Sequence, residues 1–281
     1  MTNDPETFAA RPPSMQWRGR LGVPYQGSKN QIAKEIISIL PSGKRFVDLF
    51  AGGCAMTHAA MISGKYKKFL ANDLHGFGLR LFISAIKGEC NGRWKEWVSR
   101  EEFERRKNTD PLIAICWSFG NNNNKGYLFG KDIEQSKREL HERIVKCGGY
   151  REWMRGRSTS DSLPNLERQQ ALERLEALER DYKDIPLTAA DVIYADPPYQ
   201  GTASYMGITF DNAAFWKWVD AQPYPIFVSE YTAPSGFTPI WTHGKQQLLC
   251  ADSRTNHIAE RLFVADRYAD RYQTDLFKCQ Y

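Results

Sequence analysis

The chain has 281 residues, of which 42% are hydrophobic and 13% aromatic, and its formal net charge is +5. This composition is ample for the buried core of one large or two modest domains, and it excludes a largely disordered chain. Six cysteines without a Cys-x-x-Cys pair indicate reduced thiols rather than zinc ligands or disulfides. The sequence has no run of about 18 apolar residues and no signal-peptide core, so we expect a cytoplasmic protein.

The first helix is expected close to the amino terminus, after a disordered lead-in over residues 1–16. Ser28 and Gln31 have the spacing of a capping box, and an apolar helical stripe follows them. The loop before this helix contains Tyr25 and Lys29, and it could present backbone N–H groups and an ammonium to a carboxylate or phosphate. Many helices begin this way, so the loop alone indicates little.

A glycine turn between two strands is the stronger signal. The expected order is a strand, the turn, a helix closed by glycine and a second strand: Arg45–Phe50, Ala51–Gly53, Cys54–Ser63 and Lys68–Ala71. Asp73 follows the second strand, about 20 residues after Gly52 and Gly53, at the spacing where a nucleotide-binding sheet holds a ribose diol. Each feature alone would be an ordinary turn or helix cap, whereas their order and spacing indicate a nucleotide site. The turn is not Gly-x-Gly-x-x-Gly, which disfavours a nicotinamide cofactor.

A basic and aromatic segment follows the helix expected over Leu79–Lys87. Residues 93–157 contain 15 Lys and Arg against 10 Asp and Glu, which indicates a face for a polyanion or a solvated surface. A run of four asparagines within it predicts a loop: Asn121, Asn122, Asn123 and Asn124. Asn side chains can bond adenine, and Lys125 and Tyr127 could contact phosphate. A surface turn without a partner is the alternative.

Two helices are expected after this loop. Lys131–Lys146 has the pattern of an amphipathic basic helix, with its apolar side chains turned inward: Ile133, Leu140, Ile144 and Val145. Arg151 and Arg155 extend its positive charge, and phosphate contacts are the functional interpretation, with a solvated face as the alternative for any single arginine. Leu166–Arg180 repeats Ala-Leu-Glu-Arg and is expected to be a connector helix without chemistry.

The second half of the chain is organised around Asp196. Val192–Tyr194 predicts a buried strand, which Pro197 and Pro198 stop because prolines cannot donate to a sheet ladder. The loop therefore follows the carboxyl end of a strand, where open α/β sheets bind their ligands. Asp196 and the Pro197 carbonyl could accept N–H bonds from an exocyclic amine while Tyr199 stacks on its ring. An Asp-capped turn is the alternative.

Segments on both sides of this strand also carry signals. Asp181 and Tyr182, before it, could bracket an adenine. The tail from Tyr268 has no clear signal. One further strand and a closing pair of strands are expected: Ile226–Val228, Leu248–Leu249 and Arg261–Val264.

Asp196-Pro197-Pro198-Tyr199 resembles the catalytic signature of amino methyltransferases. The order of cofactor loop, glycine motif, insert and this signature is similar to that of Dam-type DNA adenine N6-methyltransferases. The resemblance covers roughly residues 22–85 and 181–265 and is loose over the insert. It implies an α/β fold with a doubly wound, mostly parallel, Rossmann-like sheet of the class I methyltransferases. The expected divisions are a first catalytic part over 17–88, a mainly helical target-recognition insert with its connector over 89–180, and a second catalytic part over 181–281.

The resemblance also implies roles for single residues. S-adenosylmethionine would be the cofactor, with Lys29 near its methionine carboxylate and Asp73 on its ribose. The implied cofactor-binding residues are Tyr25, Lys29, Asp48, Phe50, Gly52, Gly53, Asp73, Asp181 and Tyr182. The implied catalytic residues are Asp196, Pro197 and Tyr199, and the expected DNA-binding residues are Asn121, Asn122, Asn123, Asn124, Lys125, Tyr127, Arg151 and Arg155. Ser229-Glu230-Tyr231 matches a later motif that usually has Asn in place of Glu230.

The implied reaction is direct, in-line methyl transfer to an adenine flipped out of double-stranded DNA, without a metal. Cytosine N4 methylation uses the same chemistry, although it more often has Ser at the position of Asp196. RNA, a protein glutamine amide or a non-catalytic DNA-binding module on the same fold are further alternatives. Cytosine C5 methylation is disfavoured because no cysteine here follows a proline.

Overall fold

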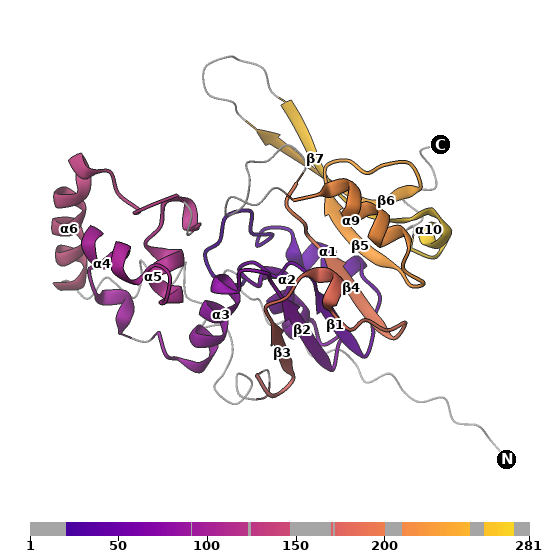
Figure 1. Cartoon of the computed structure of the whole chain (residues 1–281), viewed down its shortest axis with the longest axis horizontal. Coiled ribbons are helices and arrows are strands. Elements are labelled where there is room, and N and C mark those ends of the chain that lie inside the picture. Colours follow the sequence, from indigo (N-terminus) through magenta and orange to yellow (C-terminus); the bar gives the residue numbers. More distant parts are fainter. Residues whose placement is uncertain are drawn as a thin grey trace.

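The computed structural model describes residues 21–90, 92–122, 125–146, 170, 172–199, 210–247 and 256–272. Seven strands form one sheet in the order β3-β2-β1-β4-β5-β7-β6 (Figure 1). The strands are β1 (Arg45–Asp48), β2 (Lys68–Asn72), β3 (Leu175–Leu178), β4 (Asp191–Ala195), β5 (Ile226–Glu230), β6 (Phe237–Gln247) and β7 (Asn256–Ala265). The helices are α1 (Ala33–Ile39), α2 (Ala55–Ser63), α3 (Phe77–Lys87), α4 (Arg100–Arg106), α5 (Pro111–Cys116), α6 (Lys131–Lys146), α9 (Asn212–Asp220) and α10 (Asp266–Tyr272).

Each central strand contains a continuous apolar run because both faces of the sheet are covered. Successive side chains point to opposite faces. Phe46 and Tyr194 pack with α1, α2 and α3 on one face, whereas Val47 and Ile193 pack with α9 on the other. All the described strands are parallel except β7, which pairs antiparallel with both β5 and β6. The sheet is therefore mostly parallel and doubly wound, as the sequence predicts.

The carboxyl ends of three strands are joined by hydrogen bonds. Leu49 donates its backbone N–H to the Tyr194 carbonyl at 3.0 Å, and Ala51 donates to the Asn72 carbonyl at 2.7 Å. The Asn72 side chain donates to Leu49 O and Arg180 O, both at 3.0 Å, and accepts from Arg180 N at 3.0 Å. These bonds fix the edge of the sheet where the loops after β1, β2, β3 and β4 meet.

The insert forms a helical lobe of α4, α5 and α6 beyond α3 (Figure 1). Its core is aromatic, with Trp97, Trp117, Tyr127 and Phe129 in mutual contact. Buried residues of α5 belong to the same apolar core as α3 and the sheet. The lobe is therefore packed onto the catalytic part rather than tethered to it.

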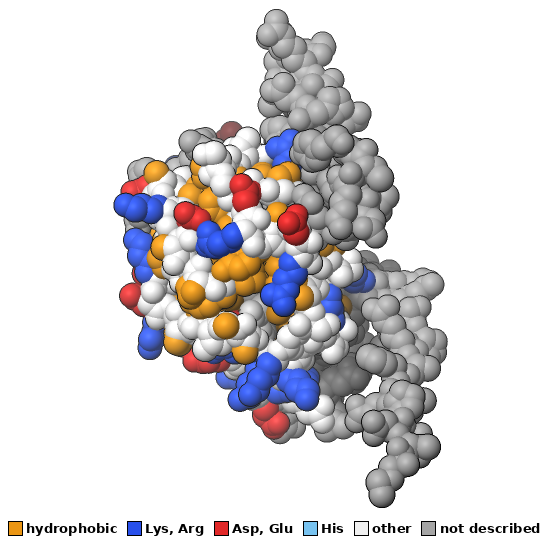
Figure 2. Space-filling view, turned by 90° about the vertical axis from the view of Figure 1, so that its right-hand side faces the viewer, with side chains coloured by type: hydrophobic (Ala, Val, Ile, Leu, Met, Phe, Trp, Pro, Cys, Tyr) orange, Lys and Arg blue, Asp and Glu red, His pale blue; other side chains and the backbone are white. Residues whose placement is uncertain are grey.

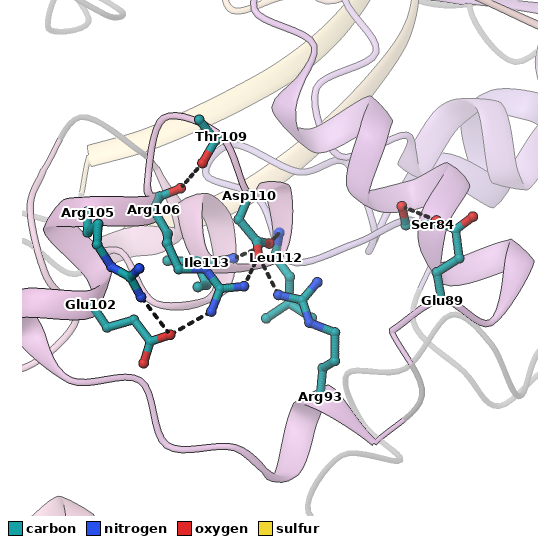
Figure 3. A network of polar contacts seen from close by, with 10 residues as sticks. All are labelled: Ser84, Glu89, Arg93, Glu102, Arg105, Arg106, Thr109, Asp110, Leu112 and Ile113. Carbon is teal, nitrogen blue, oxygen red and sulfur yellow. Dashed lines mark hydrogen bonds and ion pairs between the residues drawn. The ribbon is translucent and has the colours of Figure 1, made fainter.

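Asp110 organises the start of α5 (Figure 3). Its Oδ1 accepts the backbone N–H groups of Leu112 and Ile113 at 3.1 and 3.4 Å, which caps the helix. Its Oδ2 binds Arg106 at 2.6 Å and also binds Arg93. This network joins α4, α5 and the segment before α4, and so positions the asparagine loop that follows α5.

Residues 175–178 correct one prediction, because they form β3 rather than part of a connector helix. Glu179, which follows β3, binds Arg80 of α3 at 2.7 Å. Leu, Ala, Glu and Arg favour helices, but β3 pairs in parallel register with β2, and this pairing overrides the local preference. The sheet therefore resumes inside the segment assigned to the insert and connector.

Four other expectations differ in part. The stripe of α6 does not point inward, since Ile133 and Leu140 are 47% and 42% exposed. The Ser28–Gln31 capping box is wrong: α1 begins at Ala33 with no side-chain cap. The partner of Arg261–Val264 is β6, and Leu248–Leu249 lies outside the described residues. The tail contains α10, which the sequence analysis missed.

Figure 2 shows the face at the β6 and α10 end of the molecule. Apolar side chains there are interspersed with charged groups of both signs. Within the described part of the chain, every helix is too short or too polar to cross a bilayer.

Candidate active site

Asp196 lies at the carboxyl end of β4, as predicted, and its side chain is only 17% exposed. Lys29, from the loop before α1, places its ammonium 2.8 Å from Asp196 Oδ1 and is itself only 8% exposed. Burial raises the pKa of Asp196 to about 6, although the Lys29 charge opposes this rise. Burial lowers the pKa of Lys29, but Asp196 and Glu260 outweigh it and raise the pKa above its ordinary value. The carboxylate is therefore ionised at neutral pH and paired with a fixed cation.

Glu260 is a site residue that the sequence analysis missed. It comes from the antiparallel strand β7 and is 2% exposed. Its Oε1 lies 3.1 Å from the Lys29 ammonium and accepts the Tyr199 hydroxyl at 2.6 Å. The sequence offered one signal for it, because Glu260 is a charged residue directly before the strand expected over Arg261–Val264.

Aromatic rings surround the loop Asp196–Tyr199 after β4, which we call the Asp196 corner. Lys29 lies over the Tyr199 ring, 4.5 Å from its centroid, and Tyr231 packs edge-to-face on Tyr199 at 4.5 Å. Tyr194 and Ser229 share a hydrogen bond of 2.7 Å. The Ser229-Glu230-Tyr231 motif therefore lies beside Asp196-Pro197-Pro198-Tyr199 and supports its tyrosine. Glu230 is buried and accepts the backbone N–H of Tyr231 at 2.8 Å.

The glycine bend after β1 is closely packed. Gly52 has a φ of +48°, and a Cβ on it would lie 2.8 Å from Tyr25 Cε1. A Cβ on Gly53 would lie 2.6 Å from Tyr25 Cβ. Gly22 and Gly78 approach the bend so closely that a Cβ on either would lie 2.2 Å from a carbonyl oxygen of the bend. The Tyr25 side chain thus covers the two glycines.

The two acids beside this bend have different environments. Asp73 follows β2, and its oxygens accept backbone N–H groups of Gly52 at 2.9 Å, His75 at 3.0 Å and Gly76 at 3.3 Å. Asp48 is 1% exposed at the end of β1, and its Oδ2 accepts the Thr57 hydroxyl at 2.7 Å. Burial raises the pKa of Asp48 to about 7. Asp73 remains on the surface of the site, whereas Asp48 fixes α2 below it.

Phe50, Asp181 and Tyr182 gather at the ends of β1 and β3. Phe50 and Tyr182 are in ring contact at 5.4 Å, and Tyr182 is 7% exposed. The Asp181 carboxylate accepts Lys183 N at 3.0 Å and caps the short helical turn Tyr182–Asp184. The structure therefore brings these three residues together next to the glycine bend.

The expected DNA-binding residues divide into groups. Tyr127 is 7% exposed and donates its hydroxyl to Val98 O at 2.6 Å, so it belongs to the core of the insert. Asn121 donates to Ile115 O at 3.1 Å, and Asn122 donates to Gln26 of the cofactor loop at 2.6 Å. Lys125 is exposed. The other four lie outside the described residues: Asn123, Asn124, Arg151 and Arg155.

A cavity of about 130 Å³ lies beside the loop that contains Tyr25. It is lined by Tyr25, Ser28 and Asn121, among others, and Asp196 is not part of its wall. Ligand pockets usually measure about 300–1,000 Å³, so this cavity is too small for a whole nucleoside cofactor.

This strand order, with the glycine bend after β1 and an acid after β2, defines a class I, Rossmann-like methyltransferase fold. Residues 25–147 match the family model of the D12 class N6 adenine-specific DNA methyltransferases. The Retron Ec67 DNA adenine methylase of Escherichia coli is 24% identical over 230 residues, which cover 73% of this chain and 75% of that protein. The Dam-type resemblance is confirmed, and the two matches support a DNA adenine methyltransferase.

Two solved structures are similar to this chain at low sequence identity and low TM-score. The putative methyltransferase yhhF from Escherichia coli has a TM-score of 0.36 and 12% identity, covering 91% of this chain and 97% of its own. The rRNA methyltransferase aviRa from Streptomyces viridochromogenes has a TM-score of 0.34 and 15% identity, covering 85% and 84%. These TM-scores are low, so the fold assignment depends on the strand order described above.

Proposed function

We propose that this chain transfers a methyl group from S-adenosylmethionine to the N6 amine of an adenine flipped out of double-stranded DNA, directly and in line. The observation that carries this proposal is the Asp196 corner. A buried carboxylate lies at the end of a central strand, 2.8 Å from a buried lysine and next to an aromatic ring. Such a site can accept N–H bonds and stack a flat heterocycle.

The residues of the glycine bend fit an S-adenosylmethionine cofactor. Gly52 and Gly53 leave no room for side chains, so the backbone can approach a ligand closely once the Tyr25 ring gives way. Asp73 Oδ1 already accepts two backbone N–H groups, whereas Oδ2 accepts one and can take a ribose hydroxyl. S-adenosylmethionine would supply an electrophilic methyl group on a positively charged sulfur.

Lys29 acquires a different role from the one implied by the resemblance. Its ammonium faces Asp196 and Glu260 rather than open space beside the glycine bend. We therefore assign Lys29 to the amine site, where it holds Asp196 ionised and oriented. A second contact with the cofactor carboxylate would require the lysine to leave one of these carboxylates.

Asp196 and the Pro197 carbonyl act on the amine. The N6 lone pair is delocalised into the adenine ring and is a poor nucleophile. Two acceptors on its N–H groups favour a tetrahedral nitrogen, whose lone pair then points toward the methyl donor. Asp196 accepts most strongly when it is ionised, which holds above its pKa of about 6.

The target base has to leave the duplex, at a cost on the order of a few kcal/mol. Stacking on Tyr199 returns part of that cost, and Tyr231 and Glu260 hold this ring in place. The insert supplies the DNA contacts in this proposal, through exposed cations such as Lys125 and those of α6. Tyr127 takes no part, because it is buried.

The test is the identity of the methylated base. DNA is incubated with the protein and S-adenosylmethionine labelled on its methyl group, digested to nucleosides and separated. The proposal predicts label in N6-methyladenine only. Label in N4-methylcytosine, or no transfer with well-folded protein, would contradict it.

A further inference from the structure

Glu260 is a buried charged group to which the mechanism above gives only a supporting contact. We propose that Glu260 is a positioning residue for methyl transfer: its carboxylate fixes the Tyr199 ring and shares the Lys29 ammonium with Asp196. Asp196 then keeps part of its accepting capacity for the target amine. This inference rests on the proposed function of the Asp196 corner.

The geometry sets Glu260 firmly in place. It lies in β7, where it pairs with His243 of β6 and directly precedes Arg261, the first residue of β7 that pairs with β5. Its side chain is 2% exposed. From there it reaches groups on two other segments, Lys29 at 3.1 Å and the Tyr199 hydroxyl at 2.6 Å. A short, charge-assisted bond to the tyrosine hydroxyl restricts how that ring can turn.

Among the described residues, the carboxylates of Asp196 and Glu260 both face the ammonium of Lys29. Without Glu260, Lys29 would serve Asp196 alone and bind it more tightly, in competition with an incoming amine. With Glu260 the ammonium is divided between two acceptors, and a second carboxylate lies near the amine nitrogen, where its charge favours the positive charge that develops there.

The acid limb of the pH profile can report this effect. Charged or titratable groups facing Asp196 come from several elements: Lys29, Asp48, Tyr194, Tyr199, Tyr231 and Glu260. Of these, Lys29 lowers the pKa of Asp196 and Glu260 raises it. Removing the Glu260 charge must therefore move the limb to lower pH, which a merely structural residue would not do.

Glu260→Gln is the matched change, because the amide oxygen can still accept the Tyr199 hydroxyl while the charge is lost. The experiment measures kcat and KM from pH 5 to 9. We expect kcat to fall about tenfold with KM for S-adenosylmethionine nearly unchanged, and the acid limb to move down by about half a pH unit or more. Glu230→Gln removes another buried carboxylate and should leave the limb at the wild-type pH. An unmoved limb with wild-type kcat in Glu260→Gln overturns the inference.

Two further measurements keep the inference separate from the proposed function. A carbon-13 titration of the Asp196 carboxyl, assigned with Asp196→Asn, reports the same downward shift without any substrate. An unmoved Asp196 titration in Glu260→Gln overturns the inference, and this readout does not depend on which base is methylated. If Glu260→Gln does not fold, Tyr199→Phe removes the hydroxyl bond and keeps the ring, and a kcat equal to that of the wild type then overturns the inference.

Discussion

Lys29→Met tests how strongly the buried lysine supports the corner. The change removes one ammonium that lies 2.8 Å from Asp196 and 3.1 Å from Glu260, and it keeps a side chain of similar length. Each contact is worth about 5–6 kcal/mol of gross Coulomb energy at an effective dielectric constant of about 20. Much of this is offset by the cost of burying the lysine, so we expect a net loss of about 3–5 kcal/mol in unfolding free energy.

The loss should depend on pH in a defined direction. Without Lys29, repulsion between the two carboxylates raises the pKa of Asp196 in the folded state further. Stability then falls as pH rises, because the folded chain holds more protons than the unfolded chain. Urea unfolding at pH 6 and pH 8 measures this, with exposed Lys34→Met as the control. The acid limb of activity at saturating cofactor should also move to higher pH. Wild-type stability at pH 8 together with an unmoved limb would refute the reasoning.

Four other predictions follow from the same geometry. Gly78→Ala forces a Cβ to within 2.2 Å of Gly52 O and should cost about 3 kcal/mol by thermal unfolding, whereas Gly130→Ala, with open space around it, should cost less than about 0.5 kcal/mol. Wild-type kcat should fall about tenfold per pH unit below about pH 6 in a rate profile, as Asp196 is protonated; a flat profile down to pH 5 would remove Asp196 from its role. Asp73→Ala should weaken S-adenosylmethionine binding in calorimetry at least tenfold and leave DNA affinity intact. Lys125→Ala should reduce the salt slope of DNA binding by about one, and an unchanged slope would place the DNA face elsewhere.

The strands and turns whose sequences have a clear local signal were predicted correctly. Val192–Tyr194 reads as a strand buried on both faces, and the glycine bend and Gly64 end their elements as glycine turns do. β3 could not be found in this way, because its residues favour a helix and become a strand only by pairing with β2. The apolar stripe of α6 was expected to be buried but is exposed, because an apolar pattern does not specify which surface covers it.

The site shows a similar division. Asp196, Gly52 and Asp73 lie at the strand ends where the spacing places them. The role of Lys29 depends on its contact with Asp196, more than 160 residues further along the chain. The place of Glu260 in the site depends on its contact with Tyr199, more than 60 residues before it. No local spacing encodes such a contact.

The most direct measurement is methyl transfer by Asp196→Ala, followed with a tritiated methyl group and compared with the wild type at pH 8. The account predicts loss of transfer by at least 1,000-fold, about 4 kcal/mol of transition-state stabilisation, with S-adenosylmethionine affinity in calorimetry within about threefold of wild type. Transfer at a near-normal rate would contradict the central role of this carboxylate.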